Sequence, residues 1–189
     1  MKHAQFDGVS WTISTLASEC GYWSSLGIDS NDELHISCYD GATQDLNYFH
    51  FDGNSWSSTV VDSNHEVGAG GTSLAIDSND EIHISYDDQF GSVKYAHYDG
   101  NSWSTSTIKS NLGDGWHYPS ITTDSNNRVH VSYRDNSGAG NSNLKHAILN
   151  GTDWVANQLT WETNRDMGEY TSIAIDSVDQ VHILSLIHI

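Results

Sequence analysis

Positive charge is scarce in this sequence. Its 189 residues hold only 7 lysines and arginines against 25 aspartates and glutamates, so the formal net charge is −18 at pH 7. Nucleic acids and anionic lipid surfaces are bound through cations that neutralise phosphates, so we expect neither as a partner. No run of about 18 apolar residues is present, which predicts no membrane insertion.

Cysteine and proline are nearly absent as well. The single pair, Cys20 and Cys38, is too small for a disulfide scaffold and too isolated for a zinc motif. Both flank one predicted hairpin, so the distance between their Cα atoms decides whether they form a bridge. The polar start, MKHAQFDGVSW, is already part of a repeat and predicts no signal peptide. Abundant Asp, Asn, Ser and Thr still favour an extracellular or cell-surface location.

What the sequence does contain is an internal repeat. Residues 25–40 read SLGIDSNDELHISCYD and residues 73–88 read SLAIDSNDEIHISYDD, with twelve of sixteen positions identical. The unit returns as SITTDSNNRVHVSYRD at Ser120 and as SIAIDSVDQVHIL at Ser172. A second element, of the form FDGNSW, ends at Trp11, Trp56, Trp103 and Trp154, with spacings of 45, 47 and 51 residues. Such periods indicate a repeat architecture.

Each unit contains four short stretches with strand character. In the blade that begins with the second copy of the repeat, these stretches are Ser73–Ile76, Ile82–Tyr86, Val93–Tyr98 and Ser102–Ile108. Large apolar residues alternate with small or polar ones, and Asp-Asn or Asp-Gly turns separate the stretches. Four strands in roughly 48 residues, repeated, predict an all-β fold of β-propeller blades with inner, second, third and outer strands.

The repeat also predicts how the chain is organised. We expect one domain, residues 1–189, with units of approximately 1–46, 47–93, 94–144 and 145–189. The chain begins in a third strand, Lys2–Phe6, and stops in a second strand, so its two half-blades could close a four-bladed ring. The final LSLIHI departs from the repeat and resembles adapter read-through in metagenomic reading frames. We therefore favour a fragment of a larger propeller, and two copies could also pair as a homodimer in one ring.

Residues found in every copy are expected to stabilise the blade structure rather than to bind a ligand. The second-strand histidines are His35, His83, His130 and His182, and the outer-strand tryptophans are Trp11, Trp56, Trp103 and Trp154. Equivalent positions of a propeller lie far apart around the ring, so we expect buried neutral imidazoles rather than a shared metal. The tryptophans are expected to pack between blades.

The turn at residues 29–33, Asp-Ser-Asn-Asp-Glu, has oxygen side chains at alternate positions and invites a calcium interpretation. Calcium needs six to eight oxygens, and the third and fourth copies carry Arg128 and Val178 in place of ligands. We expect plain hairpin turns and no cofactor, with Ca²⁺ as the alternative.

Residues present in a single copy are freer to meet a ligand. Trp23, Trp116 and Trp161 lie outside the repeated Trp pattern, in or beside the connections from outer to inner strands. The same connections hold Tyr22, His117, Tyr118, Arg165, Asp166, Glu169 and Tyr170, and the longest second-to-third loop is predicted to hold Arg134 and Asp135. Aromatic faces stack on sugar rings, and charged groups bond hydroxyls or carboxylates. These residues predict a face that binds carbohydrate or another surface polymer.

The copies resemble blades of the sialidase-like, BNR-type propeller superfamily, and more closely secreted bacterial repeats of the form AIDSNDxIHISY. The resemblance covers the chain except its last six residues and implies the fold. The sialidase Asp-box reads DxGxxW, whereas residues 52–56 read DGNSW, one residue shorter. The family's arginine triad has only Arg134 and Arg165 as candidates, because Arg128 falls on the turn side.

Three functions remain open at this level. The first is a secreted binding module without chemistry of its own. The second is a glycan-active enzyme, best imagined as a polysaccharide lyase in which His117 or Tyr118 moves a proton while Arg134 neutralises a uronate. The third is a structural spacer in a larger cell-surface protein.

Overall fold

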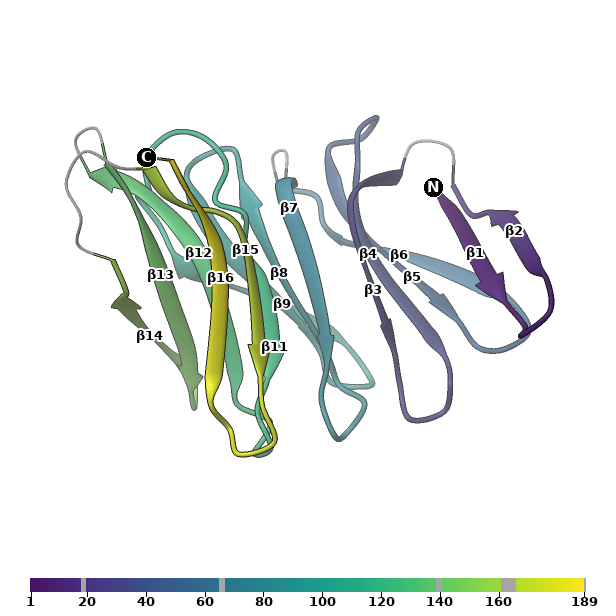
Figure 1. Cartoon of the computed structure of the whole chain (residues 1–189). Helices are drawn as coiled ribbons and strands as arrows, with labels where there is room; N and C mark the ends of the chain where they lie inside the picture. The colour runs from purple at the N-terminus through teal and green to yellow at the C-terminus, as the bar shows by residue number, and fades with distance from the viewer. Residues whose placement is uncertain (18–19, 65–66, 139–140, 161–165, 189) are drawn as a thin grey trace.

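The computed structural model describes residues 1–17, 20–64, 67–138, 141–160 and 166–188, and every regular element in these ranges is a β-strand (Figure 1). The described part of the chain has no helix long and apolar enough to cross a membrane. The expected all-β fold is confirmed.

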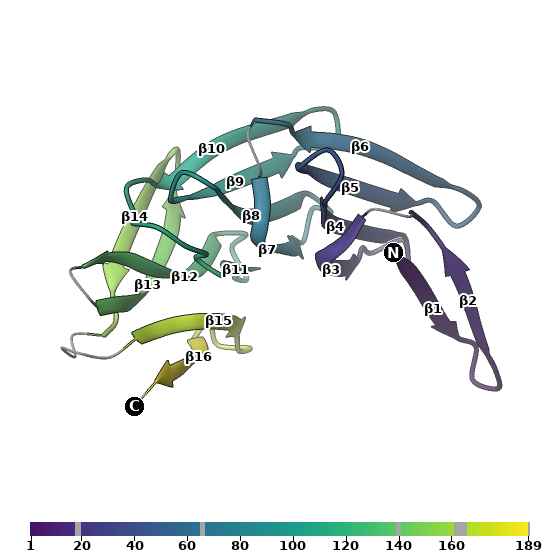
Figure 2. The same cartoon turned by 90° about the horizontal axis from the view of Figure 1, so that it is seen from above.

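Three complete blades form the centre of the molecule, each a four-stranded antiparallel sheet. The first blade consists of β3 Cys20–Ile28, β4 Leu34–Asp40, β5 Asp45–Phe51 and β6 Trp56–Asp62. The second consists of β7 Val67–Ile76, β8 Ile82–Asp88, β9 Ser92–Tyr98 and β10 Trp103–Lys109. The third consists of β11 Ser120–Thr123, β12 Val129–Gly138, β13 Asn141–Asn150 and β14 Asp153–Gln158. The inner strands β3, β7 and β11 lie side by side on the concave side of an arc (Figure 2).

A half-blade flanks the centre at each end of the chain. The hairpin β1 Lys2–Phe6 and β2 Trp11–Thr15 forms a sheet of its own, whereas β15 Asp166–Ile175 and β16 Val181–His188 join the third blade through one parallel pair, Ser142 with Asp166. Among the described residues the two half-blades do not pair, so the arc remains open and the single-chain ring is not formed (Figure 2). Pairing of two chains stays a prediction.

The hydrophobic core lies between neighbouring blades rather than within one sheet. One buried cluster joins the first and second blades and includes Leu46, Ile84 and Tyr86; another joins the second and third and includes Val131 and Tyr133. The indole of Trp103 packs edge-on against Tyr48 of the preceding blade, 5.0 Å between ring centroids, and Trp154 packs in the same way on Tyr95 at 5.2 Å. The expected packing role is confirmed for Trp103 and Trp154, whereas Trp11, in the first half-blade, is exposed.

The serines that recur in the inner strands form hydrogen bonds between neighbouring blades. Ser25 Oγ accepts a hydrogen bond from the amide of Leu74 in the next blade at 3.0 Å, and Ser73 Oγ accepts one from Ile121 at 3.2 Å. These bonds satisfy inner-strand amides that have no partner strand on that side.

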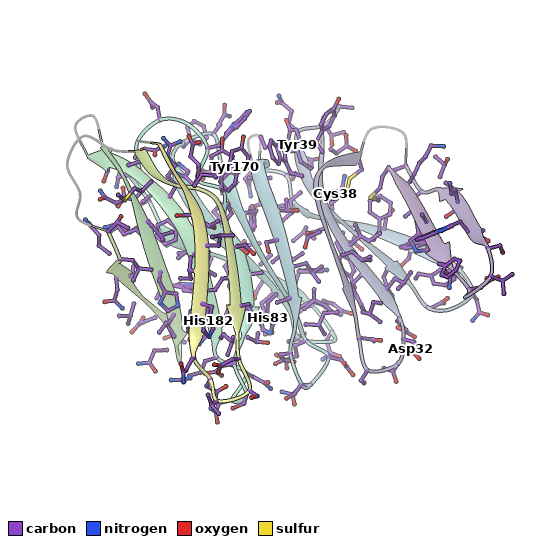
Figure 3. The ribbon with its side chains drawn as sticks, in the orientation of Figure 1. Asp32, Cys38, Tyr39, His83, Tyr170 and His182 are labelled. Atoms are coloured by element: carbon purple, nitrogen blue, oxygen red, sulfur yellow. A yellow bond between two sulfur atoms is a disulfide. The ribbon has the colours of Figure 1, made fainter. Side chains whose placement is uncertain are left out.

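The strands of all blades end on two opposite faces of the arc. One of these, which we call the turn face, is formed by the hairpin turns at residues 29–33, 77–81, 124–128 and 176–180. In the first turn, Asp29 Oδ1 accepts hydrogen bonds from the amides of Asn31 and Glu33 at 2.9 and 2.8 Å. The Ser30 amide donates to Asp80 of the next turn at 2.9 Å, so neighbouring turns are tied together. The prediction of hairpin turns is confirmed, and Figure 3 shows Asp32 at this end, away from Tyr170.

Cys20 and Cys38 form a disulfide between β3 and β4, with their Cα atoms 5.9 Å apart. That separation lies within the usual range for a bridge, and the antiparallel pairing of the two strands produces it. The bond lies near the face of the arc opposite the turn face (Figure 3). We call this opposite face the rim.

Candidate functional site

The rim is organised by one position that recurs in all four inner segments, two residues before the repeated serine; it lies within β3, β7 and β15 and just before β11. Trp23, Tyr118 and Tyr170 occupy it with φ of 51°, 46° and 49°, and Gly71 occupies it in the second blade with φ of 145°. A left-handed conformation costs a bulky L-residue about 1–2 kcal/mol, so three aromatics held there indicate a functional constraint.

Hydrogen bonds and bulges hold this strained backbone. Thr72 Oγ1 donates to the carbonyl oxygen of Trp23 at 2.6 Å, and Thr171 Oγ1 donates to that of Tyr118 at 2.8 Å. The pairing register shifts at this point in β3, β7 and β15, where a bulge turns the side chain out of the sheet.

The aromatic rings gather around one cavity. The ring centroids of Trp23 and Trp116 lie 5.7 Å apart, those of Trp23 and Tyr118 6.4 Å, and those of Tyr118 and Tyr170 4.5 Å. A cavity of about 220 Å³ lies among Trp23, Gly71, Tyr118 and Tyr170, at the place where the second blade has glycine and no ring. We call Trp23, Trp116, Tyr118 and Tyr170 the aromatic cluster.

An ion pair borders the aromatic cluster. Arg134 Nη1 lies 3.0 Å from Glu169 Oε1, and the two side chains are 14% and 19% exposed. Glu169 precedes Tyr170 in β15, so the pair lies beside the rings and offers both a cation and an anion to a polar ligand.

Tyr118 carries a neutral phenol at physiological pH. Burial, its hydrogen bond with Tyr170 and the carboxylate of Glu169 raise the pKa of Tyr118 to about 12. The hydroxyl can therefore donate a hydrogen bond to a ligand but is a poor proton acceptor.

His117 does not reach this surface, contrary to the sequence expectation. Its side chain is fully buried, its amide donates to Asp87 Oδ2 at 3.3 Å, and its Nδ1 lies 3.1 Å from the carbonyl oxygen of Arg134. Burial lowers the pKa of His117. The imidazole joins the rim connection to β12 and cannot touch a ligand in this conformation.

Arg134 and Asp135 are strand residues, not loop residues, because β12 continues through Gly138. Asp135 is buried and lies 3.2 Å from Lys145 Nζ, so it faces the sheet and not the rim. Asp166 begins β15 and Tyr22 lies in β3, where its ring is exposed. Trp161 and Arg165 fall outside the described residues.

Asp87, which the sequence analysis did not single out, is a buried carboxyl behind Trp116. It accepts a hydrogen bond from the Gly70 amide at 2.8 Å, and a Cβ at Gly70 would lie only 1.9 Å from Asp87 Oδ2. Burial raises the pKa of Asp87 to about 7. Only the tertiary structure places this carboxyl under the rim.

The raised pKa predicts how Asp87 affects stability. A carboxyl with a folded-state pKa of about 7 stabilises the fold at acid pH, and this contribution is lost as pH rises through 7. We expect Asp87→Asn to melt at a higher temperature than the wild type at pH 8, and the difference to disappear by pH 4. Asp114→Asn, an exposed site with the same charge change, is the control for melting curves from pH 4 to 8. Parallel curves for Asp87→Asn and wild type would contradict the assignment.

A second group of functional candidates was missed. Beside His35 lie Glu33 and His50, and beside His83 lie Glu81 and His97. The available signal was the second histidine, which precedes the Asp-Gly turn by two residues in both copies. This second histidine is present only in the first two blades, as His50 and His97, whereas the first histidine recurs in all four copies.

Radially arranged antiparallel sheets define a β-propeller fold. No family model and no curated protein matches the sequence. Solved structures share the fold. A mutant of AofleA from Arthrobotrys oligospora has 12% identity and a TM-score of 0.67, over 98% of this chain and 58% of that one.

Two further structures are similar. The intramolecular trans-sialidase from Ruminococcus gnavus, in complex with oseltamivir carboxylate, has 14% identity and a TM-score of 0.60, over 95% of this chain and 44% of its own. The Aleuria aurantia lectin, in complex with Fucalpha1-6GlcNAc, has 13% identity and a TM-score of 0.58, over 86% of this chain and 54% of its own. This chain thus spans less than two thirds of each of these structures.

Proposed function

We propose that this protein is a secreted propeller module that binds carbohydrate, or another hydroxyl-rich surface polymer, on its rim without chemistry of its own. One observation carries the proposal: three aromatic side chains are held in a left-handed backbone conformation around one cavity. Rings of this kind stack on the apolar faces of sugars, and the adjacent Arg134–Glu169 pair can bond hydroxyls.

Two further observations support the proposal. The similar structures include a lectin and a trans-sialidase, both solved with a ligand bound. The Cys20–Cys38 disulfide is typical of proteins that work in an oxidising compartment outside the cytosol. The lyase alternative is weakened, because the imidazole of His117 is buried and cannot meet a substrate.

The second blade supplies the design of the test, since it carries glycine at the shared rim position. We expect Trp23→Gly, Tyr118→Gly and Tyr170→Gly each to weaken glycan binding by about tenfold or more, equivalent to about 1.4 kcal/mol. Glycine adopts the left-handed conformation without strain, so the unfolding free energy should stay within about 1 kcal/mol of wild type. Binding is measured on a glycan array and then by titration with the best ligand.

Trp11→Ala is the matched control, because Trp11 is an exposed tryptophan on the outer strand β2 of the first half-blade. It should bind as the wild type does. Trp116→Ala and Arg134→Ala should also lose affinity. No glycan bound by the wild type, or binding that all five rim substitutions leave unchanged, would overturn the proposal. Absorbance from unsaturated uronates on acidic polysaccharides would instead favour the lyase.

A further inference from the structure

Two clusters of nitrogen and oxygen ligands lie toward the turn face, one in each of the first two blades. In the first, one ring nitrogen each of His35 and His50 and one carboxylate oxygen of Glu33 lie within 4.8 Å of one another, and His50 Nε2 is 2.6 Å from Glu33 Oε2. His35 and His50 face each other across the β4–β5 pairing, with stacked rings 4.8 Å apart and an interplanar angle of 17°. Asp29 Oδ2 lies 3.5 Å from His35 Nε2, on the other side.

The second blade repeats the arrangement. His83, His97 and Glu81 form the same three-ligand group, with the rings 4.9 Å apart and 3° from parallel. Asp77 Oδ2 lies 3.6 Å from His83 Nε2. A geometry reproduced at two independent places in one chain is a property of the blade sequence.

Each cluster contains a buried nitrogen that lacks a hydrogen bond. Among the described residues, His35 Nε2 and His83 Nε2 are buried and have no hydrogen-bond partner. The other ring nitrogen of each, Nδ1, lies 2.6 Å from a tyrosine hydroxyl, that of Tyr48 or Tyr95. This is the arrangement that orients a metal-ligating histidine, with one nitrogen fixed by a hydrogen bond and the other directed at the metal.

The third blade has other residues at two of the three ligand positions. There Arg128 stands in place of the glutamate and Ile148 in place of the second histidine. The guanidinium of Arg128 donates a hydrogen bond from Nε to Asp124 Oδ2 at 2.6 Å. A cationic side chain therefore neutralises the shared aspartate where the His–Glu pair is missing, which indicates that the first two clusters accommodate a cation of another kind.

The first cluster is also accessible. A cavity of about 540 Å³ between the first and second blades is lined by Glu33, His35 and His50, together with Tyr98 and Trp103. The side chains of Glu33 and His50 are 32% and 29% exposed, so an ion can enter and keep a water ligand.

We propose that each of the first two blades binds one divalent transition metal, with zinc the expected ion, through two imidazoles and one carboxylate. Two histidines and a glutamate are a known zinc ligand set, and mixed nitrogen and oxygen ligands favour zinc over calcium or magnesium. Ligands of one tetrahedral zinc lie about 3.4 Å apart. The observed spacings run from the 2.6 Å of the His50–Glu33 hydrogen bond to at most 4.8 Å, so small side-chain rotations bring all three ligands to this distance, and zinc replaces the proton of that hydrogen bond. The sequence predicts no metal because the recurring histidines lie far apart around the ring, but the three ligands of each proposed site come from a single blade.

The test is the number of ions bound per chain, measured by calorimetric titration of metal-free protein with Zn²⁺ and by elemental analysis after dialysis. The wild type should bind two ions and His97→Gln one. The double variant His50→Gln/His97→Gln should bind none. Arg128→Glu/Ile148→His, which gives the third blade the same ligands, should raise the number to three.

His182→Gln is the control, because His182 is exposed in the last half-blade, beside Asp176. It should still bind two ions. Circular dichroism checks that each variant is folded. The third ion expected for Arg128→Glu/Ile148→His is a gain of binding, so it cannot result from unfolding. A wild type that binds no zinc, or a double variant that still binds two ions, would overturn the inference. The sites lie away from the rim, so this result and that of the glycan test are independent.

Discussion

Replacing Lys94 with methionine is expected to lower the free energy of unfolding by about 3–5 kcal/mol at pH 7. The Lys94 ammonium donates a hydrogen bond to Asp62, and the two side chains are only 14% and 1% exposed. The Tyr86 hydroxyl donates to the same carboxylate at 2.8 Å. Without Lys94 the negative charge stays buried, and only the neutral donors of Tyr86 and Asn64 remain bonded to it.

The pH dependence identifies the cause. Burial would raise the pKa of Asp62, but hydrogen bonds from Lys94 and Tyr86 outweigh it and leave the pKa below its ordinary value. A lowered carboxyl pKa stabilises the fold above the unfolded-state value near 3.8, and the contribution is lost as pH falls through the folded-state value. The penalty of Lys94→Met should therefore shrink toward zero in strong acid, where Asp62 is protonated.

The measurement is urea unfolding of Lys94→Met, Asp62→Asn and the double variant, which form a double-mutant cycle. The double variant should be more stable than the sum of the single losses predicts, because neither charge is left alone. Lys109→Met, at an exposed lysine of β10, should change stability by less than about 0.5 kcal/mol. A loss for Lys94→Met that is the same at pH 3 and pH 7 would show that packing, not charge, stabilises this site.

Removing the disulfide is the second large effect. The double variant Cys20→Ser/Cys38→Ser should lose about 3 kcal/mol of unfolding free energy, since the bond closes a loop across a sequence separation of 18 residues. Both sulfurs are buried, so the serine hydroxyls add a further cost. Wild type measured in a reducing agent should approach the stability of the variant.

Only the wild type should respond to that reducing agent, because the variant has no bond to break. Equal stabilities of oxidised and reduced wild type would contradict the expected contribution. Because the disulfide joins β3 to β4 at the rim, hydrogen exchange of the Tyr22 and Trp23 amides should speed up on reduction while that of β8 amides is unchanged.

The blade could be predicted from sequence because its signals are local and repeated. The alternation in Ile82–Tyr86 and the turn residues at 77–81 act through neighbouring side chains and backbone, and the structure has the strand and the turn where they were expected. The architectural histidines followed from their recurrence: burial lowers the pKa of His35 and of His83, and each is bonded to a tyrosine of the adjacent strand. The exception is His182, which is exposed because no neighbouring strand covers it in the chain described.

The candidate site was predicted only in part. The residues outside the repeat pattern near the strand connections included Trp116 and Tyr118, whose rings meet at the rim, and also His117, which the fold buries. That Trp23, Tyr118 and Tyr170 share one repeat position was hidden, because the second blade has glycine there. The shared property is a left-handed backbone, which residue types alone do not reveal.

By itself, the sequence determined the number and order of strands, the all-β blades and the packing role of Trp103 and Trp154, because each depends on short-range chemistry copied from blade to blade. Only the tertiary structure decided which side chains meet: the aromatic cluster, the buried carboxyl of Asp87 and the two His–Glu groups. The bulges and the spacing between blades set these contacts, and both arise from packing between residues about fifty positions apart.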